Sequence, residues 1–379
     1  SKKQSTSSTN NLKVGICSEF LWDSHVVGKL YIKVLLDLLK TDLGITIYIP
    51  PKGKRYKEQN YLRNPFKRVV DLPKSVIKAQ KIIFEDNLDI LFFPDIGMSN
   101  YTYMLGLSRL ALVQINSIGH TSTSGIENID YYITNPYEPK QSDKSYTEKL
   151  IRFNKLPFNY STPEINYEHL KINSEINFKD KFLIGLTQSL FKIHPDFDEI
   201  LISILLSIKN AHLILIKDKY EYITRLLKDR WRKKSELLIR NSTFFDRLDN
   251  NDLLYLIKSC DIMLDPFYYG SGNTFYESMA FGTPFITYKN QRSKIPIAGY
   301  KQMKISNPPI ASSRADYINW CKVYAEDKNL LSKTRNNLIE KSHQYLFNDN
   351  DIYKQYYKFF TEAVKLAKEG KPLESDWST

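Results

Sequence analysis

A glycine-containing turn between Asp265 and Pro284 has the residue types and spacing of a phosphate-binding site. The apolar residues 262–264 before it predict a short buried strand, and residues 270–272 read Gly-Ser-Gly. A helix is predicted to follow, and the first N–H groups of a helix have no partner within it and lie at the positive end of its dipole. The stretch therefore predicts phosphate binding, although an ordinary strand-turn-helix unit has the same pattern.

The predicted helix carries further candidates for contacts with a nucleotide. Asn273 or Thr274 is expected to cap the helix, which is expected to end near Gly282. Gly272 and the N–H groups that follow it would hold the phosphate. Glu277 lies one turn into the helix, where its carboxylate is placed to accept hydrogen bonds from ribose hydroxyls.

A second polar loop carries a candidate cation for the same phosphate. Lys192 follows a predicted strand at 181–186 and precedes Pro195, at an expected helix N-terminus. The helix dipole does not stabilise a positive charge at this end of a helix, so the position of Lys192 would be explained if it binds a diphosphate. Gln188 and Ser189 lie in the same loop and are further donor-binding candidates. The alternative is that Lys192 is an ordinary surface lysine.

The amino-terminal half carries candidate acid–base residues where predicted elements begin or end. His25 precedes the predicted helix 27–40 and would titrate near neutral pH, as a general base should. Asp95 follows the predicted strand 90–94 and is the carboxylate best placed at a strand end. The alternatives are a structural histidine and a cap by Asp95 for the helix predicted at 99–110.

A loop rich in Ser and Thr, residues 119–125, lies between two predicted strands of the same half. His120 in this loop, with Thr121 and Ser122 beside it, is a candidate of the same kind as His25. The alternative is again a structural or surface histidine.

Strands alternate with amphipathic helices along both halves, which predicts an α/β protein with parallel sheets and ligands at the carboxyl ends of the strands. Residues 51–72 are expected to form a loop. Strands are predicted at 13–18, 45–49, 90–94, 111–116, 129–134, 181–186, 213–216, 237–239, 262–264 and 285–288, and helices at 27–40, 75–86, 99–110, 195–208, 219–234 and 250–259.

The length of 379 residues suits two domains, and the polar, proline-containing stretch 157–179 is expected to hold the linker. The predicted organisation is a disordered N-terminus at 1–11, a first domain at 12–160, a linker at 161–179, a second domain at 180–350, a helix crossing between the domains at 351–369 and a tail at 370–379.

The composition limits the classes of partner that the protein is expected to bind. The formal net charge of +12 would attract nucleic acid, an anionic membrane or a diphosphate substrate. The lysines are spread along the chain and no nucleic-acid reader motif is found, so nucleic acid is not expected. No run of 18 apolar residues occurs, so no transmembrane segment is expected.

The spacing of the cysteines indicates the cellular compartment in which the protein is expected to act. Cys17, Cys260 and Cys321 are far apart in the sequence, which favours a reducing, cytoplasmic environment over disulfides or zinc. No metal site and no cofactor are expected. Residues 1–11 lack the apolar core of a signal peptide.

Four segments together resemble the catalytic domain of the O-GlcNAc transferase, SPINDLY and HMW1C-type glycosyltransferases. They occur in the family's order, at Phe92–Met98, Ala111–Ile126 with Ile129–Ile133, Gln188–Phe197 and Asp265–Thr287. The resemblance implies the GT-B fold class, in which two Rossmann-like domains face each other across a cleft and carboxy-terminal helices pack back. It also implies an inverting, metal-independent transfer from a UDP- or GDP-sugar to a Ser, Thr or Asn side chain of a protein, or to a glycan.

The resemblance also assigns residues. Lys192 is implied as a diphosphate contact, Gly272–Thr274 as the phosphate-binding turn and Glu277 as the ribose contact. His25 aligns with the family's active-site histidine, and Gly119–Gly125 aligns with its second cleft loop, on the acceptor side. The chain reads Ser-Gly-Asn-Thr-Phe from residue 271, where animal O-GlcNAc transferases read Gly-His-Thr-Thr-Gly, and no tetratricopeptide repeats are found, so the acceptor stays open.

Three other functions stay open beside this one. The first is a GT-B enzyme that builds a polysaccharide, and the second is a pseudoenzyme or accessory subunit that binds a nucleotide sugar. The third is a nucleic-acid-binding protein, which only the net charge favours.

Overall fold

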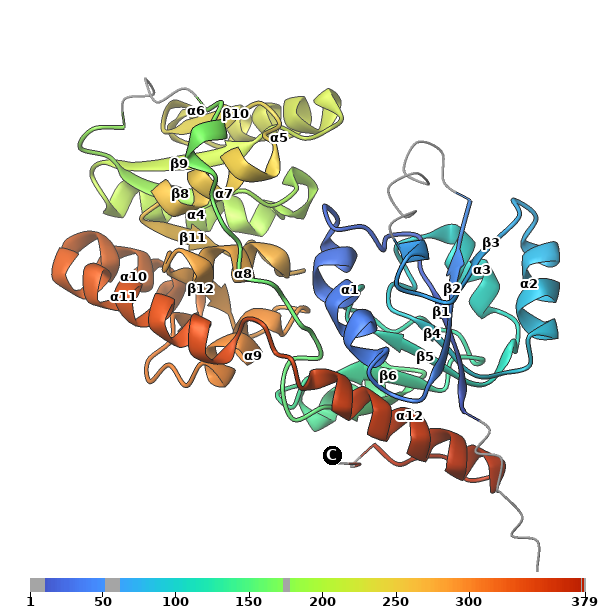
Figure 1. The fold of residues 1–379 in the computed structure, drawn as a ribbon. Helices are drawn as coiled ribbons and strands as arrows, with labels where there is room; N and C mark the ends of the chain where they lie inside the picture. The colour runs from blue at the N-terminus through green and yellow to red at the C-terminus, as the bar shows by residue number, and fades with distance from the viewer. Residues whose placement is uncertain (1–10, 52–61, 173–177, 376, 378–379) are drawn as a thin grey trace, which may run out of the picture. The chain divides into compact units, whose positions relative to one another are not determined.

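The computed structural model describes residues 11–51, 62–172, 178–375 and 377. The chain divides into two compact units, each with its own sheet and helices (Figure 1). The first unit comprises Ser1–Asn159 and Asn350–Thr379, and the second comprises Tyr160–Asp349. The chain therefore leaves the first unit once and returns to it with its last helix.

The first unit is built on a parallel sheet with the strand order β3-β2-β1-β4-β5-β6-β7. Buried aliphatic and aromatic residues fill its central strands, as expected for a sheet covered on both faces. The strands are β1 (Lys13–Cys17), β2 (Gly44–Ile49), β3 (Arg68–Asp71), β4 (Leu88–Phe93), β5 (Ala111–Ser117), β6 (Tyr131–Thr134) and β7 (Lys149–Arg152).

Helices cover both faces of this sheet. The helices α2 (Val76–Glu85) and α3 (Asn100–Gly106) pack against each other and share one apolar core with the strands. The helices α1 (Val26–Leu38) and α12 (Ile352–Lys368) also pack together, and α12 contacts β4 and β5. The Phe92 ring lies 5.9 Å from Tyr356 and 6.2 Å from Phe360, so aromatic packing attaches the last helix to the sheet.

The second unit has a parallel sheet with the order β10-β9-β8-β11-β12-β13. Its strands are β8 (Phe182–Leu186), β9 (Ala211–Ile216), β10 (Ser242–Phe245), β11 (Ile262–Leu264), β12 (Phe285–Tyr288) and β13 (Ile310–Ala311). Its helices are α4 (Pro195–Ser207), α5 (Glu221–Lys234), α6 (Glu236–Arg240), α7 (Asn250–Ser259), α8 (Asn273–Ala280), α9 (Ile295–Gln302), α10 (Arg314–Glu326) and α11 (Lys328–Tyr345).

One buried ion pair ties two helices of this unit together. Asp198 of α4 is almost fully buried and accepts two hydrogen bonds from the Arg230 guanidinium, at 2.8 and 2.9 Å. Trp231 Nε1 donates a third hydrogen bond to the same carboxylate at 2.8 Å. These hydrogen bonds offset the cost of burying the carboxylate in the core.

The strand predicted at 237–239 is wrong, because these residues lie in the short helix α6. Ser235 caps this helix by accepting a hydrogen bond from the N–H of Leu237, and the strand of this region follows later, as β10. A run of three apolar residues fits either element, and here the cap decided for the helix.

Two edge strands of the first unit were not predicted. Residues 51–72 were expected to form a loop, but β3 pairs with β2 in this range; residues 52–61 lie outside the described part. The strand β7 pairs with β6 at the opposite edge. Each of these strands has only four residues with a charged residue at either end, so its sequence lacks the continuous apolar run that identifies central strands.

Candidate functional site

The phosphate-binding candidate of the second unit is the turn between β11 and α8. Gly272 is the N-cap residue of α8, and no side chain caps this helix. The prediction that Asn273 or Thr274 would be the cap is therefore wrong, since Asn273 is already the first helical residue. Because glycine has no side chain to accept a hydrogen bond, the first N–H groups of α8 stay available to an anion.

A buried carboxylate holds this turn in place. Asp265 is completely buried and accepts hydrogen bonds from the hydroxyls of Ser271 at 2.8 Å and Thr287 at 2.7 Å. Burial raises the pKa of Asp265 to about 6, against the opposing effect of these hydrogen bonds and of the Lys192 charge. Asp265 thus links β11, the turn and β12.

Side chains from the neighbouring loops complete the support of the turn. Gln188 Nε2 donates to the Leu264 carbonyl at 2.9 Å and to Ser271 Oγ at 3.1 Å. Ser293 Oγ donates to the Ser271 carbonyl at 2.8 Å. Gly270 has a φ of 81°, a conformation that favours glycine. Gln188, a predicted donor-binding residue, therefore uses its amide nitrogen to hold the turn.

Lys192 approaches the same turn from the loop after β8. Its Nζ lies 4.7 Å from the centroid of the Tyr269 ring, directly before the glycine turn. Within the described residues no carboxylate lies within ion-pairing distance of Lys192. Burial lowers the pKa of Lys192, and the charge of Asp265 partly offsets this effect. The ammonium group of Lys192 therefore has no anionic partner at ion-pairing distance in the described part of the chain, and a bound anionic ligand would supply one.

The other predicted donor-side residues divide between the turn and the surface. Ser189 is exposed, and its side chain caps no helix. The side-chain oxygen of Asn273 is buried and has no hydrogen-bond partner among the described residues. The Thr274 carbonyl accepts a hydrogen bond from Ser278 Oγ at 2.6 Å.

Glu277 is buried at the predicted position, one turn into α8. Burial raises the pKa of the Tyr160 hydroxyl well above 10, and the charge of Glu277 raises it further. Tyr160 stacks on Tyr276 with ring centroids 4.4 Å apart. The carboxylate therefore lies in an aromatic environment, where a hydrogen-bonding ligand would stabilise its charge.

In the first unit, His25 is the N-cap residue of α1. Its Nδ1 accepts a hydrogen bond from the N–H of Val27 at 3.2 Å. The imidazole stacks on Phe20, with centroids 4.6 Å apart, and lies 4.7 Å from the Trp22 ring. The fold thus gives His25 a structural task beside any chemical one.

Asp95 is completely buried after β4 and accepts a hydrogen bond from the Ser18 hydroxyl at 2.7 Å. The alternative in which Asp95 caps the next helix is wrong, because Ser99 is the N-cap residue of α3. Ser99 also donates to Glu19, so the loops after β1 and β4 are joined by two carboxylate–hydroxyl contacts.

The loop with His120, Thr121 and Ser122 lies beside the loop that carries Asp95. A Cβ at Gly97 would lie 3.0 Å from His120 Nδ1, and a Cβ at Gly119 would lie 2.0 Å from the Pro94 carbonyl oxygen. Only glycine permits this close approach. The sequence pattern missed Glu148, which anchors the loop by accepting hydrogen bonds from Thr123 Oγ1 at 2.6 Å and the N–H of Ser124 at 2.7 Å.

Two kinds of feature are absent from the described residues. No group of three or more His, Cys, Asp or Glu side chains in this part of the chain is arranged to hold a metal ion. No helix there has both the length and the apolarity needed to cross a membrane.

The chain is similar in sequence to two kinds of protein glycosyltransferase. It is 27% identical over 271 residues to a probable UDP-N-acetylglucosamine–peptide N-acetylglucosaminyltransferase SPINDLY of Eustoma exaltatum subsp. russellianum, covering 69% of this chain and 29% of that protein. It is 25% identical over 280 residues to a UDP-glucose:protein N-beta-glucosyltransferase of Actinobacillus pleuropneumoniae, covering 72% of this chain and 44% of that protein. The chain thus spans less than half the length of these relatives, and no family model matches it.

Solved structures agree with this similarity at the level of the fold. A mutant of the O-GlcNAc transferase of Thermobaculum terrenum superposes with a TM-score of 0.79 at 18% identity, covering 95% of this chain and 69% of that one. Anabaena HepE, in complex with UDP and glucose, gives 0.60 at 14% identity, covering 93% and 100%. The predicted resemblance and the α/β, GT-B fold class are confirmed.

Proposed function

We propose that this chain transfers a sugar from a UDP-sugar to a side chain of a protein. The observation that carries the proposal is the arrangement in the second unit, where the uncapped N-terminus of α8 and the half-buried Lys192 adjoin one turn. The names of the sequence relatives support a UDP-sugar donor and a protein acceptor. The UDP bound to HepE, which shares the fold, supports the same donor class.

The proposed reaction is a single displacement at C1 of the sugar. The acceptor atom forms a bond to C1 while the bond to the diphosphate oxygen breaks on the opposite face, so the configuration inverts. The departing UDP takes up the electron pair, and the acceptor proton passes to a base. Lys192 and the N–H groups at the start of α8 would stabilise the negative charge that grows on the diphosphate, without a metal ion.

The environment of Lys192 suits this role better than a structural one. Its lowered pKa means that the protein does not favour its charged form, and the charge of Asp265 offsets this effect only in part. A diphosphate would supply the missing partner. One such donor typically contributes about 2.7–4 kcal/mol to lowering the barrier. His25 and Asp95 remain the proposed acid–base residues of the first unit, and His120, Thr121 and Ser122 the proposed acceptor contacts.

The donor role of the turn also includes Gly272, Asn273, Thr274 and Glu277. The first three would bind phosphate through their N–H groups, and Glu277 would accept hydrogen bonds from the ribose. The free, buried state of Cys17, Cys260 and Cys321 supports the proposed cytoplasmic location.

The test begins with thermal unfolding of the purified chain in the presence of UDP, GDP, UDP-GlcNAc, UDP-glucose and GDP-fucose. A ligand at 100 times its Kd should stabilise the protein by about 2.7 kcal/mol, which raises Tm measurably. We expect stabilisation by the uridine nucleotides. Transfer of labelled sugar to acceptor proteins is then measured with and without EDTA, and should persist with EDTA.

The outcomes separate the alternatives. No stabilisation by any uridine nucleotide would contradict the donor assignment. Binding of UDP with neither transfer nor donor hydrolysis would favour a pseudoenzyme. Transfer to oligosaccharides with none to proteins would favour a polysaccharide-building enzyme, and an α-linked product from an α-linked donor would contradict inversion.

A further inference from the structure

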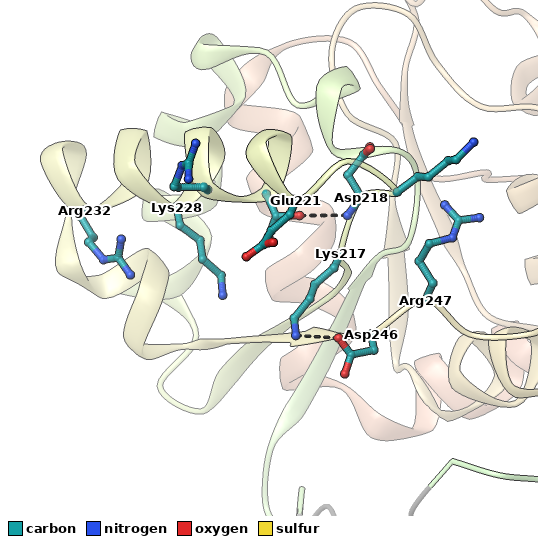
Figure 2. A pocket seen from close by; sticks show the side chains of 10 residues that line it. Lys217, Asp218, Glu221, Lys228, Arg232, Asp246 and Arg247 are labelled. Carbon is teal, nitrogen blue, oxygen red and sulfur yellow. Dashed lines mark hydrogen bonds and ion pairs between the residues drawn. The ribbon is translucent and has the colours of Figure 1, made fainter.

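A basic groove lies on the second unit, between α5 and the chain segments that follow β9 and β10 (Figure 2). We call it the α5 groove. It has a volume of about 570 Å³. One face of α5 forms one side, and the residues directly after the two strands form the other. No aromatic side chain is among the described residues that line it.

The α5 groove carries more positive charge than its own carboxylates can neutralise. Its carboxylates are Asp218, Glu221 and Asp246. Among the described residues, the one ion pair that joins two of its lining side chains is that of Lys217 with Asp246, at 2.7 Å (Figure 2). Six cationic side chains line the groove: Lys217, Lys219, Arg225, Lys228, Arg232 and Arg247.

Several of these cations have no anionic partner in the described part of the chain. No carboxylate there lies within ion-pairing distance of Arg225, Lys228 or Arg247. Burial lowers the pKa of Lys228, and the positive charges of Lys217 and Arg232 lower it further. The groove therefore holds like charges near one another at an energetic cost that a bound anion would relieve.

We propose that the α5 groove binds an acidic segment of the acceptor protein, an inference that rests on the proposed function. The cationic residues of α5 lie at Arg225, Lys228 and Arg232, so they line one face of the helix over two turns. The lining of α5 from Glu221 to Arg232 extends about 16 Å along the helix axis. An extended peptide of about five residues has the same length.

The groove suits an acidic peptide better than a nucleic acid or a membrane. Its lining includes three carboxylates beside the cations, so a phosphate chain lying along the whole groove would meet repulsion at Asp218, Glu221 and Asp246. A peptide can place neutral residues at these points. Single-stranded nucleic acids also use aromatic side chains for base stacking, which this lining lacks. The flat surface of a bilayer does not match the shape of a concave groove.

Fluorescence anisotropy can test the groove without any sugar nucleotide. The probe is a fluorescein-labelled ten-residue peptide in which Glu alternates with Gly, and its neutral counterpart has Gln in place of Glu. The double variant Arg225→Glu/Lys228→Glu reverses two charges inside the groove. The matched control, Lys209→Glu/Lys233→Glu, makes the same change in net charge at two exposed positions outside the lining.

We expect the acidic peptide to bind the parent protein and the control variant with Kd values within about twofold, and the groove variant about tenfold more weakly, a difference of about 1.4 kcal/mol. Binding should weaken with added salt, because the contacts are screened charge pairs. Equal loss in both variants would overturn the proposal, since it would reduce the effect to net charge. Binding of the Gln peptide as tightly as the Glu peptide would also overturn it.

Two further arms separate the other occupants and the proposed function. A groove-dependent binding of oligothymidine or of phosphatidylglycerol vesicles, with no groove-dependent binding of the peptide, would overturn the proposal. UDP binding is measured by calorimetry on the same three proteins and should be equal in all of them. Failure of the parent to bind UDP would defeat the proposed donor site, whereas loss of the groove effect alone would defeat only the docking surface.

Discussion

The start of α8 differs from most other helix starts of the molecule in how the first N–H groups are satisfied. In the first unit, His25 caps α1 and Ser99 caps α3 with side-chain hydrogen bonds. In the second unit, α4, α6, α7, α10 and α11 have side-chain caps as well, but α8, which follows its N-cap residue Gly272, has none. The helices α1, α3 and α8 each follow a strand of a parallel sheet. The comparison teaches that a polar residue after a strand is not by itself a sign of a ligand, because the fold often uses it as a cap.

The buried carboxylates of the two units differ in a related way. Asp95 joins the loops of the first unit through its hydrogen bond with Ser18. Asp265 connects the glycine turn, through Ser271, to β12, through Thr287. The polar groups of the second unit thus support a turn whose own N–H groups are left for an anion. We therefore expect the loss of a cap in the first unit to lower stability, and a change at the glycine turn of the second unit to alter ligand binding.

The largest expected effect tests whether His25 does more than cap α1. Asn is as good an N-cap residue as any, so His25→Asn should keep the cap and the fold, with a small loss of Tm from the lost ring contacts with Phe20 and Trp22. If His25 is the general base, as proposed, turnover should fall by about 10²–10⁴-fold. Retained turnover in this variant would leave His25 a cap only. His25→Ala, which removes the cap as well, should cost about 1 kcal/mol of stability.

Lys192→Met should also lower turnover, here through the second unit. Turnover should fall by about 10²–10³-fold, because one donor to the leaving diphosphate is lost. The pKa of Lys192 is lowered by burial, so its charged form destabilises the fold at neutral pH, and the Met variant should unfold at an equal or higher Tm. Lys209→Met, at an exposed position, is the matched control for activity. A clear drop in Tm with unchanged turnover would make Lys192 a structural residue.

Asp265→Asn tests the support of the turn through its pH dependence. The pKa of Asp265 is raised from 3.8 in the unfolded chain to about 6 in the fold, so the folded state binds the proton more tightly. This group therefore stabilises the fold below about pH 4, and that contribution, about 3 kcal/mol, is lost as the pH rises to about 6. The variant lacks this proton equilibrium.

The measurement is denaturant unfolding at several pH values. The difference in free energy of unfolding between wild type and Asp265→Asn should change across pH 4–6 and be constant above that range. A difference that stays constant from pH 4 to pH 7 would contradict the raised pKa.

The smallest effects are expected from two substitutions that exchange glycine and serine at the N-cap positions of α8 and α2. Gly272→Ser places a hydroxyl beside the first N–H groups of α8, but Gly272 does not have the extended backbone of the capping residues His25 and Ser99, so no gain in stability is expected. The new hydroxyl competes with phosphate for the same N–H group, so UDP affinity measured by calorimetry should fall about tenfold. Ser75→Gly removes the cap of α2 in the first unit and should lower stability slightly with UDP affinity unchanged. Equal UDP affinity in Gly272→Ser would show that the start of α8 does not hold the phosphate.

Local patterns in the sequence predicted much of the fold. The alternation of apolar strands and amphipathic helices predicted both parallel sheets, and the glycine turn at 270–272 predicted a helix start that the structure contains. These signals depend on neighbours along the chain, which the sequence displays directly. Where a local signal was short or mixed, as at 237–239 and at the edge strand Arg68–Asp71, the prediction was wrong.

Tertiary structure decided which polar side chains form hydrogen bonds within the fold and which could contact a ligand. Gln188, which was predicted as a ligand contact, also has a structural role, because its amide nitrogen donates a hydrogen bond to Ser271, 83 residues away. Neither the burial of Asp265 nor the approach of Lys192 to Tyr269 follows from local spacing. Hydrogen bonds, burial and the pKa shifts they cause depend on segments distant in the sequence, so only the folded chain determines them.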